Sequence, residues 1–209
     1  MLLATLLALS PAAYAEPTAQ EVVTAVEATY KDVQSLSASF VQVTRSSMGE
    51  MQQQGSVQLK RPRMMRWDFT EPATSSFITN GSMLWVWSAD QNQVIVTEDL
   101  SGATSGNDMS QLLDDLSKLG ELFTVETVGQ EAASHTLKLT PKTPSASVKQ
   151  LQLVVSSDAY ILQRVVVVDS FDAVVELDFT GVSLNTEISD ERFNFVTPEG
   201  ATTIKTDGL

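Results

Sequence analysis

The chain of 209 residues contains no cysteine and one histidine, and 26 acidic against 13 basic residues give it a net charge of −13. Without cysteine there are no disulfides and no thiolate metal sites. A lipid-anchored lipoprotein is excluded too, because its acyl chains sit on an N-terminal cysteine. The acidic balance argues against nucleic acid as a partner, since phosphates require basic patches.

Groups for catalysis are equally scarce. The only histidine, His135, has no nucleophile motif beside it and shares strand parity with Leu137 and Leu139. Asp114 and Asp115 are neighbours on an expected helix, so their carboxylates diverge by about 100°. No glycine-rich phosphate loop occurs. We therefore expect a protein that is not an enzyme, with no catalytic residues, no metal and no cofactor.

The longest uncharged apolar stretch lies at the N-terminus. Residues 1–15 hold a leucine-rich run that is too short to span a bilayer, followed by Ala13-Tyr14-Ala15, which is typical of a signal-peptide cleavage site. This predicts export, with residues 16–209 forming one mature domain that works outside the cytoplasm. The alternative is a cytoplasmic protein with an apolar N-terminus.

A helix is predicted at the start of the mature chain. Thr18 and Glu21 have the spacing of a capping box. Apolar residues follow at helical spacing, and the helix is expected to end near Gln34. The helical apolar positions are Val22, Val26, Tyr30 and Val33.

Beyond Gln34 the apolar period changes to two, which indicates half-buried antiparallel strands of a barrel or sandwich. Asn80-Gly81 marks a hairpin. In each of these strands the odd-numbered positions are apolar. They are Val57, Leu59, Met65, Trp67, Phe69, Trp85, Trp87, Leu137, Leu139, Leu151 and Leu153. These residues serve equally well as a filled core or as the lining of a cavity.

One segment interrupts the strands. Residues 101–108 are rich in Gly, Ser and Thr and predict a loop. A short helix is expected next, with Gly120 as its stop. Its apolar stripe consists of Met109, Leu112, Leu113, Leu116 and Leu119. A loop that leads into a leucine-rich helix describes either a movable lid or a permanent plug.

The basic residues are concentrated in one segment, 60–66, which holds four of the 13. Strand parity places Arg61 on the apolar face just before Pro62. A buried guanidinium needs partners, and carbonyl groups at a helix end or loop would provide them. Such bonds would latch a lid. The alternative is that Pro62 ends the strand and Arg61 turns toward solvent.

These residues together resemble the LolA-type family of periplasmic lipoprotein carriers. The resemblance extends from about residue 36 to 204. It rests on the following motifs: Ser39-Phe40-Val41-Gln42, Gly55, Lys60-Arg61-Pro62, Arg66-Trp67, Glu71-Pro72, Asn80-Gly81, Trp85-x-Trp87, Asn185, Ile188, Phe193-Asn194-Phe195, Pro198 and Gly200. Trp87 stands where the family usually has tyrosine, and residues 90–120 match poorly.

The resemblance implies a mainly β fold, an unclosed antiparallel half-barrel of about eleven strands with helices as a lid over an apolar cavity. It implies that Phe40 joins the apolar residues above in lining that cavity, and that Arg61 bonds the lid. It also implies lipoprotein cargo, loading by an ATP-driven inner-membrane transporter, release to an outer-membrane acceptor, and a monomeric carrier. Two alternatives remain: an envelope-stress sensor with the same half-barrel, and a carrier of another lipid such as a glycolipid.

Overall fold

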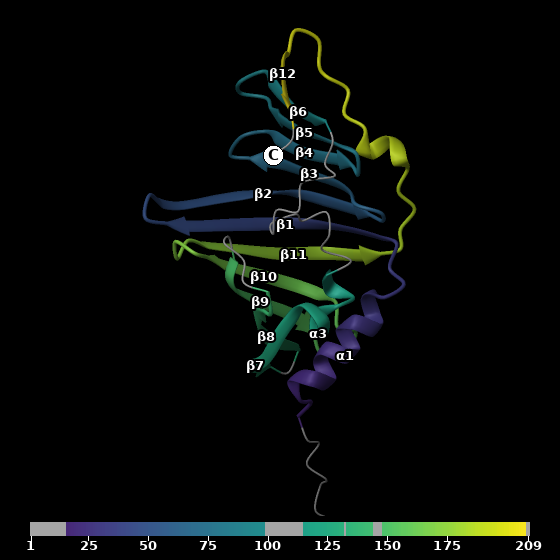
Figure 1. The fold of residues 1–209 in the computed structure, drawn as a ribbon, viewed down its shortest axis with the longest axis vertical. Helices are drawn as coiled ribbons and strands as arrows, with labels where there is room; N and C mark the ends of the chain where they lie inside the picture. Colours follow the sequence, from purple (N-terminus) through teal and green to yellow (C-terminus); the bar gives the residue numbers. More distant parts are fainter. Residues whose placement is uncertain (1–15, 99–114, 132, 144–147, 208–209) are drawn as a thin grey trace, which may run out of the picture.

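The computed structural model describes residues 16–98, 115–131, 133–143 and 148–207 (Figure 1). The predicted signal peptide, residues 1–15, lies outside the described residues. The described residues form one sheet, two α-helices and a 3₁₀ helix. The strands are β1 (Ser35–Ser46), β2 (Gly49–Lys60), β3 (Met64–Glu71), β4 (Ser75–Asn80), β5 (Met83–Ser88), β6 (Gln93–Glu98), β7 (Phe123–Glu131), β8 (Ser134–Pro141), β9 (Val148–Ser156), β10 (Leu162–Asp169), β11 (Val174–Leu184) and β12 (Thr202–Asp207).

The sheet is open, with strand order β12-β6-β5-β4-β3-β2-β1-β11-β10-β9-β8-β7. Strands β1 and β11 join the first half of the chain to the second, and β12 is parallel to β6 whereas the other neighbours are antiparallel. The edge strands β12 and β7 are not paired with each other. The predicted unclosed β architecture is therefore confirmed, with twelve strands in the described part of the chain where about eleven were expected.

Helix α1 (Ala19–Tyr30) begins at the predicted capping box. The Glu21 backbone N–H donates to the Thr18 hydroxyl at 3.3 Å, and the Thr18 backbone N–H donates to the Glu21 carboxylate at 2.8 Å. The helix ends at Tyr30, earlier than the expected Gln34. The carbonyl oxygens of Tyr30 and Lys31, at this end of the helix, accept hydrogen bonds from the Arg61 side chain.

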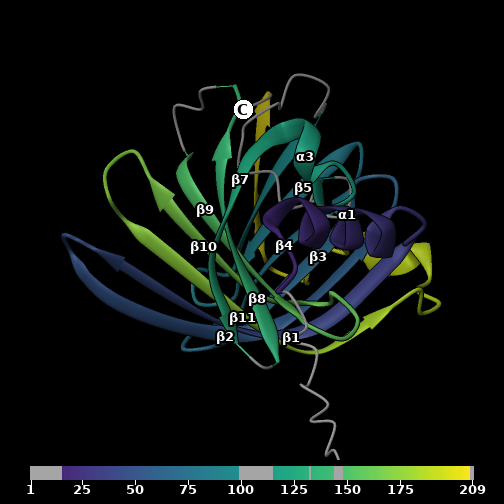
Figure 2. The same ribbon diagram turned by 90° about the horizontal axis from the view of Figure 1, so that it is seen from below.

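The sheet is curved, and both helices lie on its concave side (Figure 2). Val22, Val26 and Tyr30 of α1 are fully buried in the main hydrophobic core, together with apolar side chains of the facing strands. The Leu162 backbone N–H donates to the Tyr30 hydroxyl at 2.9 Å, which fixes α1 to β10. Neither helix of the described residues has the length and apolar composition needed to cross a bilayer.

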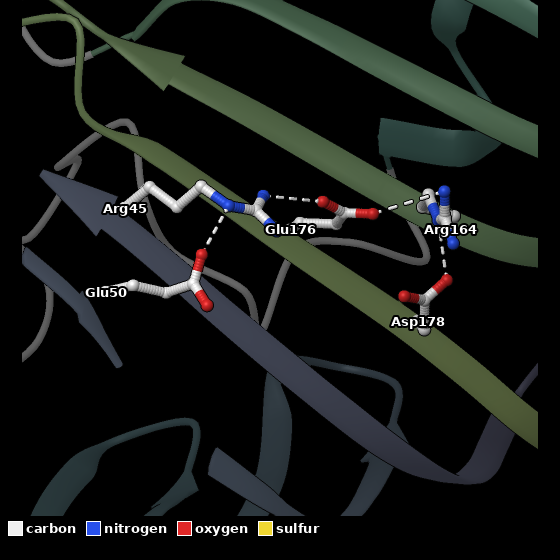
Figure 3. Close-up of polar contacts among 5 residues, drawn as sticks. All are labelled: Arg45, Glu50, Arg164, Glu176 and Asp178. Atoms are coloured by element: carbon white, nitrogen blue, oxygen red, sulfur yellow. Dashed lines mark hydrogen bonds and ion pairs between the residues drawn. The ribbon is translucent and has the colours of Figure 1, made fainter. Parts of the chain in front are cut away.

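Charged side chains occupy the opposite, convex face of the central strands (Figure 3). Arg45 of β1 pairs with Glu50 of β2 at 2.8 Å and with Glu176 of β11 at 2.9 Å. Arg164 of β10 continues the network to Glu176 at 3.1 Å and also contacts Asp178. Both arginines are nearly half exposed, so each pair adds little to stability. The arrangement keeps these charges away from the concave side.

Candidate functional site: the covered concave face

The concave face is the face of the sheet that packs on α1. Most of the apolar residues predicted for a cavity lie here and are at most 8% exposed. Leu151 lies on the same face and is partly buried. The buried members are Phe40, Val57, Leu59, Met65, Trp67, Phe69, Leu137, Leu139 and Leu153. The structure thus brings residues from five strands into one apolar surface.

An aromatic cluster forms the centre of this surface. The Phe40 ring lies 4.8 Å from the Trp67 ring and 5.2 Å from the Phe69 ring. Gly55 is paired with both Phe40 and Phe69, and a Cβ at this position would lie 1.9 Å from the Asp68 carbonyl oxygen. Because Gly55 has no side chain, β2 and β3 approach closely and the two phenyl rings meet over it.

Phe179 of β11 completes the cluster, 6.3 Å from Trp67 and 6% exposed. It was absent from the predicted cavity residues. The sequence of its strand nevertheless predicts this position. Val175, Leu177 and Phe179 alternate with polar neighbours in the same way as the residues that were assigned to the cavity.

Trp85 and Trp87 lie on the convex face, so their assignment to the cavity is wrong. Trp67 pairs with Phe77 in the β3–β4 ladder, whereas Trp85 pairs with the next residue, Ile78. Neighbouring residues of a strand point to opposite faces. Trp85 and Trp87 instead belong to a second cluster with Ile78, Val94 and Val96.

The C-terminal segment after β11 covers this second cluster. The Phe195 ring lies 5.8 Å from the Trp87 ring. The 3₁₀ helix η3 (Asp190–Phe193) precedes it, and Lys60 donates to the Ile188 carbonyl at 2.7 Å on the way. β5 is apolar on both faces, with Val86 on the concave side and Trp85 and Trp87 on the convex side. The C-terminal segment that covers the convex side explains why the second face is apolar too.

The concave face continues toward the β12 edge as an incompletely covered apolar row. Phe77, Val86, Ile95 and Ile204 are directly paired across β4, β5, β6 and β12. Phe77 is 39% exposed and Ile204 is 42% exposed. The Phe77 ring lies 6.1 Å from Phe69, so the row is continuous with the aromatic cluster.

The cover of the concave face consists of α1 and the described segment 115–122, which includes α3. Arg61 lies at the end of β2 and contacts this cover. Its guanidinium donates to the carbonyl oxygens of Tyr30, Lys31 and Val33 at the end of α1. It also donates to the Ser117 hydroxyl at 3.4 Å, just before α3 (Leu119–Leu122). One side chain thus bonds both helical segments of the cover, which is the type of partner that strand parity predicted.

The described end of the predicted lid helix is buried. Leu116 is 1% exposed and lies in the main core with α1. Met109, Leu112 and Leu113 lie outside the described residues. Gly120 was expected to stop the helix, but it lies inside α3.

Gly120 permits close approach of α3 to α1. Its backbone N–H donates to the Glu27 carboxylate at 2.7 Å, and a Cβ at this position would lie only 3.3 Å from the same carboxylate, Glu27 Oε1. Gly120 therefore lies at the contact between α1 and α3 and does not end a helix.

Two other residues of the basic cluster, Lys60 and Arg66, are paired with acidic groups. Lys60 contacts the Asp190 carboxylate, and Arg66 pairs with Asp68 at 2.6 Å. These contacts reduce the positive charge that the sequence places around residues 60–66. The Lys60–Asp190 contact anchors β2 to the segment after β11, whereas the Arg66–Asp68 pair lies within β3.

His135 is buried at the start of β8 and stacks on Tyr160, with ring centroids 5.8 Å apart. Its Nδ1 is buried and has no hydrogen-bond partner among the described residues. Nearby, burial raises the pKa of the Tyr30 phenol above its ordinary value of 10.0, so this hydroxyl stays protonated at neutral pH.

Two curated relatives match most of the chain. The outer-membrane lipoprotein carrier protein of Hahella chejuensis is 28% identical over 186 residues, which is 88% of each chain. The protein of the same name from Methylobacillus flagellatus is 29% identical over 181 residues, or 86% of each chain.

Among solved structures, an uncharacterized conserved protein from Thermus thermophilus has the same fold, with a TM-score of 0.57 and 13% identity. The match covers 90% of this chain and 99% of that chain. The model of the family "Outer membrane lipoprotein carrier protein LolA" matches residues 31–196, which include β1 to β11, Arg61 and the aromatic cluster of the concave face. The chain therefore belongs to the LolA family.

Proposed function

We propose that this chain is a periplasmic carrier that encloses the acyl chains of lipoproteins released from the inner membrane and delivers them to an outer-membrane acceptor. The observation that carries the proposal is the continuous apolar concave face under a cover that Arg61 holds through hydrogen bonds. The curated relatives named as lipoprotein carriers support it.

The physical problem is the transfer of acyl chains through water. Burial of each CH₂ group contributes about 0.8 kcal/mol, so two or three chains amount to roughly tens of kcal/mol. A carrier needs an apolar surface that water does not reach, and apolar area removed from water dominates such binding. The half-covered row from Phe77 to Ile204 gives the concave face a place to admit chains beside the covered core.

Release requires that the empty carrier be stable in its own closed state. The Arg61 bonds to α1 and Ser117 supply favourable contacts that loading has to break. These bonds therefore compete with cargo. In this proposal an ATP-driven transporter in the inner membrane supplies the energy of loading.

Mass spectrometry of the carrier purified from periplasm tests the proposal. We expect triacylated lipoprotein bound in substoichiometric amount. Free lipid or glycolipid in its place would support a general lipid carrier, and a preparation without acylated ligand that also fails to bind purified lipoprotein would contradict the proposal.

A further inference from the structure

We propose that the Trp67 indole N–H donates a hydrogen bond to an ester carbonyl oxygen of the bound acylglyceryl group. This inference rests on the proposed carrier function. It adds a polar recognition step to a surface that otherwise binds by apolar contact.

The starting observation is a buried donor without a partner. Trp67 is 5% exposed, and its Nε1 atom is buried with no hydrogen-bond partner among the described residues. Buried polar groups in folded proteins are nearly always paired, so an exception at the centre of a candidate site needs an explanation.

Among the residues that the structure describes, none supplies an acceptor within hydrogen-bonding distance of the Trp67 Nε1 atom, and the neighbours named here are apolar. The Phe40 and Phe179 rings lie 4.8 Å and 6.3 Å away, and the residues paired with Trp67 in the ladder are Val57 and Phe77. A water molecule requires several polar partners to occupy such a site. The N–H is therefore satisfied most effectively by an acceptor that arrives with an apolar ligand.

Ligand chemistry then selects the ester. An indole N–H is a donor only, so its partner must be an acceptor. The hydrocarbon part of an acyl chain has neither donors nor acceptors, whereas the ester that joins it to glycerol has a carbonyl acceptor and no donor. An ester therefore satisfies Trp67 without leaving a donor of its own unpaired in the apolar site.

Two other buried atoms are unpaired in the described part of the chain, the Thr127 hydroxyl and His135 Nδ1. A hydroxyl rotates and both donates and accepts, and a neutral imidazole nitrogen does either according to its tautomer. Trp67 alone is an obligatory donor, and it alone lies within the aromatic cluster.

The test compares two synthetic lipopeptides with the same short neutral peptide and a free α-amine. One carries two ester-linked palmitoyl chains on its glyceryl-cysteine, and the other carries ether-linked chains of the same length. Affinities are measured by displacement of a fluorescent fatty-acid probe from wild type, Trp67→Phe and Trp85→Phe. Trp85 is the matched control because it is also buried but lies on the convex face.

We expect wild type and Trp85→Phe to prefer the ester lipopeptide by about tenfold, the effect of one buried hydrogen bond, and Trp67→Phe to bind both equally. An unchanged ester preference in Trp67→Phe, or none in wild type, overturns the inference while the carrier function stands. If neither lipopeptide binds any of the three proteins, the carrier function itself fails.

Nuclear magnetic resonance of wild type keeps the test decisive if Trp67→Phe does not fold. The Trp67 indole N–H resonance should move downfield with the ester lipopeptide and stay in place with the ether analogue. An equal shift with both ligands would contradict the proposed bond.

Discussion

Arg61 shows how a single side chain connects the fold to the proposed function. It follows the last residue of β2, and its guanidinium reaches three carbonyl oxygens at the end of α1 and the hydroxyl of Ser117. Carbonyl groups in the last turn of a helix lack intrahelical partners, and an arginine with five donors can satisfy several acceptors at a helix end together. In the proposed carrier, these hydrogen bonds hold α1 and the Ser117 segment in the closed arrangement.

Replacement Arg61→Leu should increase the amount of lipoprotein that stays bound. The variant loses the charged hydrogen bonds of the empty closed state but keeps the apolar concave face. We expect retained cargo to rise about tenfold or more, because charged hydrogen bonds contribute roughly 1.5–3 kcal/mol. Quantitative mass spectrometry of co-purified lipoprotein and transfer to acceptor-containing liposomes measure the effect.

Arg45→Leu is the matched control, since Arg45 lies in the ion-pair network of the convex face. It should load and release cargo as wild type does. Equal retention in Arg61→Leu and wild type would show that Arg61 does not act as a latch.

At the scale of elements, α1 covers the concave face and its stability follows from local sequence. The capping box joins Thr18 and Glu21 at the first turn. Hydrogen bonds from the Thr18 backbone and hydroxyl lower the pKa of Glu21 below its ordinary value of 4.5. A lowered pKa in the folded state means that the ionised carboxylate stabilises the fold above that pH, and that this contribution is lost as the pH falls.

Glu21→Gln should therefore be less stable than wild type at pH 7, with the difference disappearing as the pH is lowered through and below 4.5. Glutamine retains an acceptor for the Thr18 N–H but removes the negative charge near the helix N-terminus. Urea unfolding at a series of pH values measures this.

Glu187→Gln serves as the control because Glu187 is exposed and lies outside the helices and strands. A difference between Glu21→Gln and wild type that persists unchanged into acid would contradict the assigned role of the carboxylate.

For the whole molecule, the proposed carrier function requires that the contact between α1 and α3 control access to the concave face. The two helices touch where Gly120 approaches Val23, and the Gly120 N–H bonds Glu27. Arg61 contacts the segments adjoining this junction. If loading opens the cover, the two helices separate there.

The absence of cysteine makes this proposal directly testable with one engineered disulfide. In Val23→Cys/Gly120→Cys, a Cβ at position 120 would lie 3.5 Å from the present Val23 Cγ1, which occupies a γ position like that of a cysteine sulfur, so the two cysteine side chains would be adjacent. We expect the oxidised protein to lose lipoprotein loading at least tenfold, because the cover stays closed, and reduction with dithiothreitol to restore it.

Each single cysteine variant should load normally under both conditions. Equal loading by the oxidised and reduced double variant would show that cargo enters without separation of α1 from α3.

Much of this protein could be predicted from its sequence, because the relevant signals are local. The Thr18–Glu21 spacing fixes the start of α1, and alternation within a strand places Trp67 and Phe69 on the same face. Parity at the end of β2 also placed Arg61 on the side of the cover. These properties depend on the backbone period and on residues a few positions apart.

Only the tertiary structure decided how the strands combine. Trp67 and Trp85 share a parity in the sequence, yet the register of β4 places Phe77 beside one and Ile78 beside the other, which sends the two tryptophans to opposite faces. Alternation fixes faces within a strand, but pairing between strands fixes which parities share a face. Contacts that span the chain, such as Arg61 with α1 and Phe195 with Trp87, likewise exist only once the sheet has curved and its covers have docked.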